Sequence, residues 1–276
     1  MLKTTLINGL EIPSIGFGTW QLTENIEEVI TIALNAGYRH IDTAVVYGNE
    51  TEIGNAIKKS DVNREEIFLT TKIWNTHRGY DLVMQSFNES LQRLQTDYVD
   101  LLLLHWPEKT STKNWEDINY SSWRALEELF LKGKVKSIGL SNFMVDHLNS
   151  LLKKCFIKPM VNQIEYHPGY LQQAVVNLCN ERGIKLEAWS PIGSGRLLEN
   201  PLLKDLAIKY QVSVAQLCIQ FALQNNIIVL PKSTNPKNIN SNLNFDKFEI
   251  HEQDMVLIKN MNETGWSGLD PDKVDF

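Results

Sequence analysis

The chain has 276 residues, of which 43% are hydrophobic and 22% are charged, and its formal net charge is -6. This composition is typical of a globular protein with a sizeable core, and the negative charge gives no reason to expect nucleic acid or a membrane surface as partner. The three cysteines are widely spaced and form no Cys-x-x-Cys pattern, which argues against a disulfide framework or a zinc cluster. No export signal or membrane-length apolar run is visible, so we expect a cytoplasmic protein.

The chain begins with a hairpin signal and then alternates between short apolar runs and amphipathic segments. Asn8-Gly9, a strong hairpin signal, separates Thr4–Ile7 from Glu11–Pro13. Eight candidate strands follow, near residues 14–19, 39–44, 67–72, 99–105, 135–141, 160–166, 185–190 and 227–232. Helical patterns lie between them, among others at residues 25–35, 80–94 and 122–131. We predict a (β/α)8 TIM barrel formed by one domain, residues 1–276, with the hairpin closing the bottom of the barrel.

Four titratable residues stand where candidate strands end or just beyond. Asp42, Lys72 and His105 close three of the runs, and Tyr47 lies in the loop after the first. Because the carboxyl ends of barrel strands surround one mouth, these side chains are expected to meet in one pocket. A lysine beside the phenol would lower its pKa, the carboxylate would keep that lysine charged, and the imidazole would position a carbonyl oxygen. The set therefore predicts protonation of a carbonyl while a second group supplies hydride.

The hydride source is suggested by the loop after the last strand. Leu230–Pro236 carries a lysine and two hydroxyls before Asn235-Pro236, the residue types that open a helix, and this loop is a usual phosphate position in barrels. The segment Gly193–Leu198 has only half of a Gly-x-Gly-x-x-Gly pattern, and no acidic residue follows at the required distance, so a Rossmann site is not indicated.

Other interpretations stay open for single residues. Lys72 and Asp42 alone could be a structural ion pair, and Tyr47 or His105 alone could be packing residues. A barrel metallohydrolase could use His40, Asp42 and His105, with His167 after a later strand, although no metal-binding motif strengthens it.

The order of several motifs resembles that of the aldo-keto reductases along the whole chain, in particular bacterial members of the 2,5-diketo-D-gluconate reductase type. The matching stretches are Gly16-Phe-Gly-Thr-Trp20, Gly37-Tyr-Arg-His-Ile-Asp-Thr-Ala44, Tyr47-Gly-Asn-Glu50, Thr71-Lys-Ile-Trp74, Asp100-Leu-Leu-Leu-Leu-His-Trp106, Gly139-Leu-Ser-Asn-Phe143, Asn162-Gln-Ile-Glu-Tyr166, Ala188-Trp-Ser-Pro191 and Leu230-Pro-Lys-Ser233. The resemblance implies NAD(P)H-dependent reduction of aldehydes or ketones, with Tyr47 as general acid, Lys72 and Asp42 tuning it, and His105 orienting the carbonyl.

The resemblance also implies an extended NADP(H) across the mouth. Ser141, Asn142 and Gln163 map to the nicotinamide amide, and Trp189 to the aromatic that stacks on the ring. The full set of implied cofactor positions is Gly18, Thr19, Trp20, Asp42, Ser141, Asn142, Gln163, Trp189, Ser190, Pro191, Gly193, Lys232, Ser233, Thr234, Asn238 and Asn242.

One cofactor position departs from the family pattern. Members that prefer NADPH usually carry an arginine where this chain has Asn238, and an asparagine lacks its charge and bidentate geometry. Lys232 matches the family and Lys237 is adjacent. NADP(H) is therefore expected to be preferred, with NAD(H) possible.

The substrate is expected to be a small carbonyl compound. Trp20, Trp74 and Trp106 lie near strand ends and, with Tyr47 and His105, are predicted to line its site, although each tryptophan could instead be a packing residue. Because residues 107–120 look short and polar and the tail 265–276 is brief, we expect an open mouth. The resemblance also leads us to expect a monomer. A cofactor-binding regulatory barrel with little turnover is the alternative.

Overall fold

The structure is a computed structural model that describes residues 2–244 and 248–276, and its centre is a barrel of parallel strands. The strands pair in chain order: β3 (Phe17–Gly18), β4 (His40–Asp42), β5 (Phe68–Ile73), β6 (Leu101–Leu104), β7 (Ile138–Ser141), β8 (Val161–Glu165), β9 (Lys185–Trp189) and β10 (Ile228–Leu230). The ring closes between its first and last strands, where Gly16 N donates to Val229 O at 2.8 Å and Val229 N donates to Ser14 O at 3.0 Å. The predicted (β/α)8 barrel is confirmed.

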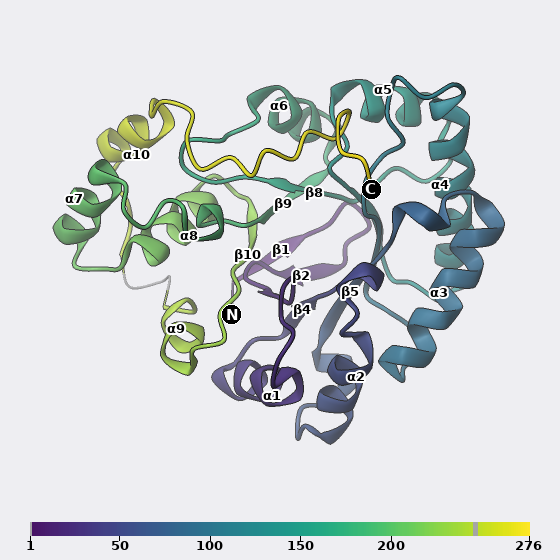
Figure 1. Cartoon of the computed structure of the whole chain (residues 1–276), viewed down its shortest axis with the longest axis horizontal. Coiled ribbons are helices and arrows are strands. Elements are labelled where there is room, and N and C mark those ends of the chain that lie inside the picture. The colour runs from purple at the N-terminus through teal and green to yellow at the C-terminus, as the bar shows by residue number, and fades with distance from the viewer. Residues whose placement is uncertain (1, 245–247) are drawn as a thin grey trace.

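Helices surround the strands, as Figure 1 shows. They are α1 (Ile26–Ala36), α2 (Glu50–Lys59), α3 (Tyr80–Leu94), α4 (Trp115–Leu131), α5 (Val145–Lys154), α6 (Gln173–Arg182), α7 (Pro201–Tyr210), α8 (Val214–Gln224), α9 (Pro236–Ser241) and α10 (Glu252–Lys259). Short 3-10 turns are η1 (Val45–Tyr47), η2 (Arg64–Glu66), η3 (Asn75–His77) and η4 (Gly193–Gly195). The helices cover the outer face of the strands, and the four leucines of β6 are all buried.

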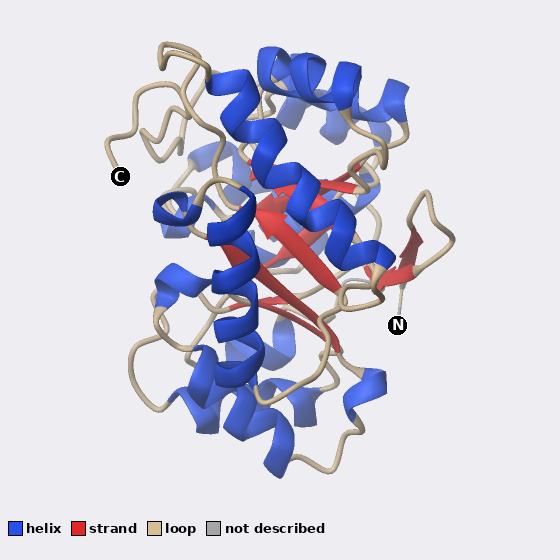
Figure 2. Cartoon of the chain, turned by 90° about the vertical axis from the view of Figure 1, so that its right-hand side faces the viewer, coloured by secondary structure: helices blue, strands red, loops and turns tan. Residues whose placement is uncertain are grey.

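The hairpin lies at the end of the barrel away from the strand C-termini. β1 (Lys3–Thr5) and β2 (Glu11–Pro13) pair antiparallel, and Asn8 Nδ2 donates to the backbone oxygen of Lys136, just before β7. Ile12 is fully buried against the core. Figure 2 shows the N-terminal hairpin and the C-terminal segment on opposite sides of the barrel. The predicted hairpin at the barrel bottom is therefore present.

Two expectations about the mouth need correction. Helix α4 begins at Trp115 rather than near residue 122, so Asn119 is helical; it is also buried, and its Oδ1 accepts a hydrogen bond from Glu108 N at 2.8 Å. The C-terminal tail also reaches the mouth, where Lys109 Nζ contacts Asp275 Oδ1 at 2.6 Å and Thr110 N donates to Asp272 Oδ1 at 2.7 Å. The mouth, expected to be fairly open, is thus partly covered by the tail on the β6 side.

Within the described parts of the chain, no single helix has the length and apolar character needed to cross a membrane. Helices α7 and α8 meet that criterion only as a pair bent by 87°.

Candidate active site

A cavity of about 610 Å³ occupies the mouth at the C-terminal ends of the strands. Its walls come from nearly every strand-end loop and from the C-terminal tail. The lining residues are Gly18, Thr19, Trp20, Gln21, Asp42, Val46, Tyr47, Trp74, His105, Trp106, Asn142, Gln163, Trp189, Ser190, Pro191, Ile192, Ser194, Gly195, Leu230, Lys232, Leu269 and Phe276. An active site at this end is the usual arrangement of barrel enzymes.

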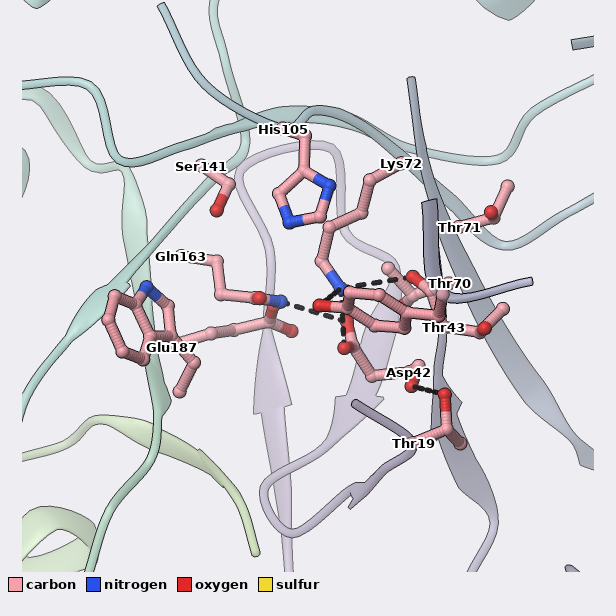
Figure 3. A network of polar contacts seen from close by, with 12 residues as sticks. Thr19, Asp42, Thr43, Thr70, Thr71, Lys72, His105, Ser141, Gln163 and Glu187 are labelled. Atoms are coloured by element: carbon pink, nitrogen blue, oxygen red, sulfur yellow. Dashed lines mark hydrogen bonds and ion pairs between the residues drawn. The ribbon is translucent and has the colours of Figure 1, made fainter. Parts of the chain in front are cut away.

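Lys72 is fully buried and contacts an acceptor for each of its ammonium protons (Figure 3). Its Nζ lies 2.5 Å from Asp42 Oδ1, 3.0 Å from the backbone oxygen of Thr43 and 3.4 Å from Tyr47 Oη. Burial alone would lower the pKa of Lys72, but the Asp42 carboxylate and Tyr47 outweigh it and raise that pKa. The lysine is therefore a stable cation, and the structure brings Asp42, Lys72 and Tyr47 together as predicted.

The expected lowering of the Tyr47 pKa is not the net result. Lys72 does favour the phenolate, yet burial of the phenol is the larger effect and the pKa of Tyr47 is raised. Because Lys72 donates to Tyr47 Oη, the phenol must direct its own proton elsewhere, and Tyr47 lines the cavity. Tyr47 thus keeps its proton at neutral pH and has it free for a group in the cavity.

His105 follows β6 and lines the same cavity. Its ring packs edge-on against Tyr47 at 5.6 Å and Trp74 at 5.1 Å. Burial and the nearby Lys72 charge hold the pKa of His105 well below its ordinary value, so the imidazole is neutral. Nδ1 is buried without a hydrogen-bond partner among the described residues. Since a buried unpaired N–H is rarer than an unpaired acceptor, we assign the ring proton to Nε2.

Gln163 and Asn142 also line the cavity. Gln163 Nε2 donates to Asp42 Oδ2 and to Glu187 Oε2, each at 2.9 Å, so both amide protons are in use. Its oxygen has no partner among the described residues. Asn142 adopts a left-handed backbone conformation with φ 63, donates to His105 O and Ser141 Oγ, and accepts from Trp189 Nε1 at 2.8 Å. These bonds fix the Trp189 ring at the edge of the cavity.

Sequence reasoning missed Glu187, a buried titratable residue beneath the cavity, and considered its neighbour His40 only as a possible metal ligand. Glu187 on β9 and His40 on β4 are fully buried, with His40 Nε2 3.9 Å from Glu187 Oε1. Burial and the charge of Asp42 raise the pKa of Glu187 to about 8, and burial lowers the pKa of His40 to about 4. One sequence signal was available, because Glu187 is two residues from Trp189 and so points to the same face of the strand.

The other predicted cofactor residues divide into two groups. Gly18, Thr19, Trp20, Ser190, Pro191 and Lys232 line the cavity. The second group lies outside the cavity lining and consists of Gly193, Ser233, Thr234, Asn238 and Asn242. Asn235 caps α9 as the sequence predicts, and its side chain accepts a hydrogen bond from Lys237 N at 2.9 Å. Of the latter group, Thr234 and Asn238 are exposed on the surface.

The predicted aromatic wall has a further member. Trp20, Trp74 and Trp106 all line the cavity, and Phe276 stacks on Trp74 at 5.1 Å and packs edge-on against Trp106 at 5.3 Å. Asn75 Nδ2 holds the tail by donating to Phe276 O at 3.0 Å. The tail residues Leu269 and Phe276 had no sequence signal, since their place depends on how the tail crosses the mouth.

The metal-site alternative has no support in the geometry. The proposed ligands contact other groups: His40 pairs with Thr70, Asp42 with Lys72, and His167 with Glu165 and the backbone oxygen of Pro168. Among residues 2–244 and 248–276, no group of three His, Cys, Asp or Glu side chains is arranged to hold a metal ion.

Comparison with known proteins places this barrel in one family. Residues 14–263 match the model of the aldo/keto reductase family. Glyoxal reductase of Bacillus subtilis is 43% identical, over 100% of this chain and 99% of that protein. The crystal structure of MGS-M4, an aldo-keto reductase from a Medee basin deep-sea metagenome library, superposes with a TM-score of 0.93 at 40% identity, covering 100% of both chains.

A variant of Gox0644, solved in complex with NADPH, superposes with a TM-score of 0.92 at 36% identity, over 100% of this chain and 99% of the other. The chain therefore belongs to the aldo/keto reductase family. Its general chemistry is that of an oxidoreductase that reduces carbonyl groups with a nicotinamide cofactor.

Proposed function

We propose that this chain reduces aldehydes and ketones to alcohols, with Tyr47 as the general acid and NADPH as the preferred cofactor. The observation that supports this most is the contact of Lys72 Nζ with both Asp42 Oδ1 and Tyr47 Oη. Because Lys72 donates to Tyr47 Oη, the phenolic proton of this half-buried tyrosine is the proton available to a carbonyl in the cavity.

Two of the four residues act on the carbonyl oxygen directly, and the other two support Tyr47. His105 donates its Nε2–H to the carbonyl oxygen and orients it, while the aromatic wall holds the rest of the substrate. NADPH, when bound, supplies the hydride to the carbonyl carbon. Tyr47 gives its proton to the oxygen as negative charge develops there, and Lys72 stabilises the phenolate that remains. Asp42 keeps Lys72 charged and in place throughout.

The residues at the mouth suit a nicotinamide cofactor. The unpaired oxygen of Gln163 is an acceptor for a carboxamide N–H, and Trp189 offers a fixed ring for stacking. Lys232 lines the cavity and Lys237 is exposed at the start of α9. Within the described residues neither lysine has an ion-pair partner, so both are available to a phosphate. We expect NADPH to be preferred over NADH, by less than in relatives that have arginine at position 238.

The aromatic wall favours flat or apolar carbonyl compounds, and the similarity to glyoxal reductase adds small α-dicarbonyls as candidates. The test is a panel of methylglyoxal, benzaldehyde and a keto sugar, assayed with NADPH by the loss of nicotinamide absorbance. Steady turnover supports an enzyme, whereas oxidation of a single equivalent of NADPH would support the regulatory alternative.

Replacement of the general acid tests the mechanism. Tyr47→Phe keeps the ring and removes the proton, so kcat should fall by about 10²–10⁴-fold. Tyr120→Phe, at a half-buried tyrosine of α4 away from the cavity, serves as the matched control and should keep wild-type turnover. Wild-type turnover in Tyr47→Phe would disprove the assignment.

A further inference from the structure

One fully buried acid beneath the cavity has no part in the mechanism above. Glu187 lies on β9 between the register partners Gln163 on β8 and Ile228 on β10. It does not line the cavity, and the only hydrogen bond of its side chain among the described residues is the one it accepts from Gln163 Nε2 at 2.9 Å. A buried carboxyl of this kind is costly and calls for a physical explanation.

The contact with Glu187 completes the bonding of the Gln163 amide. One N–H of Gln163 donates to Asp42 Oδ2 and the other to Glu187 Oε2 (Figure 3). A rotated amide would turn its oxygen toward the Asp42 carboxylate, which can only accept hydrogen bonds, and would take both N–H groups away from Asp42 and Glu187. The two carboxyls together therefore fix the amide in one orientation, with its oxygen as the atom left for the cavity.

The other groups around Glu187 do not replace this contact. His40 and Asp42 face it from β4, and Lys72 influences it from β5, but His40 Nε2 is 3.9 Å away and bonds Thr70 Oγ1 at 3.1 Å instead. From β10 the neighbouring residues Ile228, Val229 and Leu230 are apolar. Because the pKa of Glu187 is raised to about 8, the side chain is mainly a neutral acid at pH 7, and glutamine is its close mimic.

We propose that Glu187 is a positioning residue for cofactor binding: together with Asp42 it accepts hydrogen bonds from the two N–H groups of Gln163 and so presents the Gln163 oxygen to the carboxamide of the nicotinamide. This inference rests on the proposed function. It predicts that Glu187 affects recognition of the carboxamide N–H and leaves recognition of the adenosine part unchanged.

Three ligands separate these effects. Kd values are measured at pH 7 by calorimetry for NADP⁺, for its 3-acetylpyridine analogue, in which a methyl group replaces the carboxamide NH₂, and for adenosine 2′,5′-bisphosphate, which has no nicotinamide. The wild type should bind NADP⁺ about tenfold more tightly than the acetylpyridine analogue, as expected for one hydrogen bond to a fixed buried acceptor.

Variants at position 187 then test the role of the acid. Glu187→Met removes the acceptor, and Glu187→Asp keeps a carboxyl that no longer reaches Gln163. Both should lose the preference for NADP⁺ over the analogue while binding adenosine 2′,5′-bisphosphate as the wild type does. Glu187→Gln should restore the preference. Glu187→Asp keeps the test valid if Glu187→Met does not fold, as judged by circular dichroism.

The outcomes distinguish this inference from the proposed function. Wild-type protein that binds neither NADP⁺ nor adenosine 2′,5′-bisphosphate would contradict the proposed function itself. Wild-type protein that binds NADP⁺ without preferring it over the analogue would overturn the inference alone. The inference would also be overturned if Glu187→Asp or Glu187→Met protein kept the preference for NADP⁺ over the analogue. It would likewise be overturned if these variants lost affinity for all three ligands equally.

Discussion

Glu187 and His40 are buried neighbours, and burial shifts their pKa values in opposite directions. Glu187 has a pKa raised from 4.5 to about 8, so the folded state binds its proton more tightly than the unfolded state does. His40 has a pKa lowered from 6.5 to about 4, so the folded state binds its proton less tightly. By linkage, His40 makes the free energy of unfolding rise between pH 4 and 6.5. Glu187 makes it fall between pH 4.5 and 8.

Glu187→Gln should therefore change how stability depends on pH. Wild-type protein loses stability as the pH rises because Glu187 must give up its proton, whereas glutamine has no such proton to lose. The free energy of unfolding of the variant minus that of the wild type should therefore increase by about 1.4 kcal/mol per pH unit between pH 5 and 8. Above pH 8 the difference should level off. Urea unfolding at one-unit pH steps measures it, with Glu24→Gln at an exposed carboxylate as control. Parallel curves for Glu187→Gln and wild type would contradict the buried protonated acid.

Strand ends could be predicted from the sequence much better than the loops beyond them. Asp42, Lys72 and His105 were found because each closes an apolar run, and parallel strands bring such ends together. Glu187 lies inside a strand, and its environment depends on contacts with residues of other strands, such as Gln163 on β8. The period of the sequence pattern does not reveal such contacts. The start of α4 was misjudged because polar residues at its first turns conceal the helical period, and Phe276 was missed because nothing local to the tail encodes its contact with Trp74.

At the scale of a single element, helix α9 is expected to influence the preference for NADPH over NADH. Asn238 is exposed there, and Asn238→Arg would add a guanidinium that can form bidentate, charge-assisted bonds to the 2′-phosphate of NADPH. The ratio of kcat/KM for NADPH to that for NADH should rise about 10- to 100-fold. Asn240→Arg adds the same charge two positions along the helix, on a different face, and should change the ratio little. If this ratio rose equally in both variants, the added charge alone would be responsible. If it did not rise in Asn238→Arg, position 238 would not belong to the cofactor site.

At the scale of the whole molecule, the N-terminal hairpin and the C-terminal tail lie on opposite sides of the barrel (Figure 2). The hairpin covers the N-terminal end, where Ile12 is buried and no cavity residue lies. The tail crosses the other end, where Glu165 accepts hydrogen bonds from Ser267 N at 2.9 Å and from Ser267 Oγ at 2.6 Å. Arg196, beyond the turn η4, also donates to Glu165 at 3.3 Å. The tail and the loop after β9 are thus held by one buried carboxylate, and the mouth takes its shape from both.

Phe276 is the residue through which the tail should affect substrate choice. Phe276→Ala removes a ring that packs on Trp74 and Trp106, and an aromatic contact of this kind is worth about 0.5–1.5 kcal/mol, so KM for benzaldehyde should rise about 2- to 10-fold. KM for methylglyoxal should change less, because that molecule is too small to use the whole wall. Trp266→Ala is the matched control, since Trp266 lies in the same tail but stacks on Tyr170 outside the cavity lining. An equal rise in KM for both substrates, or in both variants, would show that the tail acts by general closure of the mouth and that Phe276 makes no selective contact.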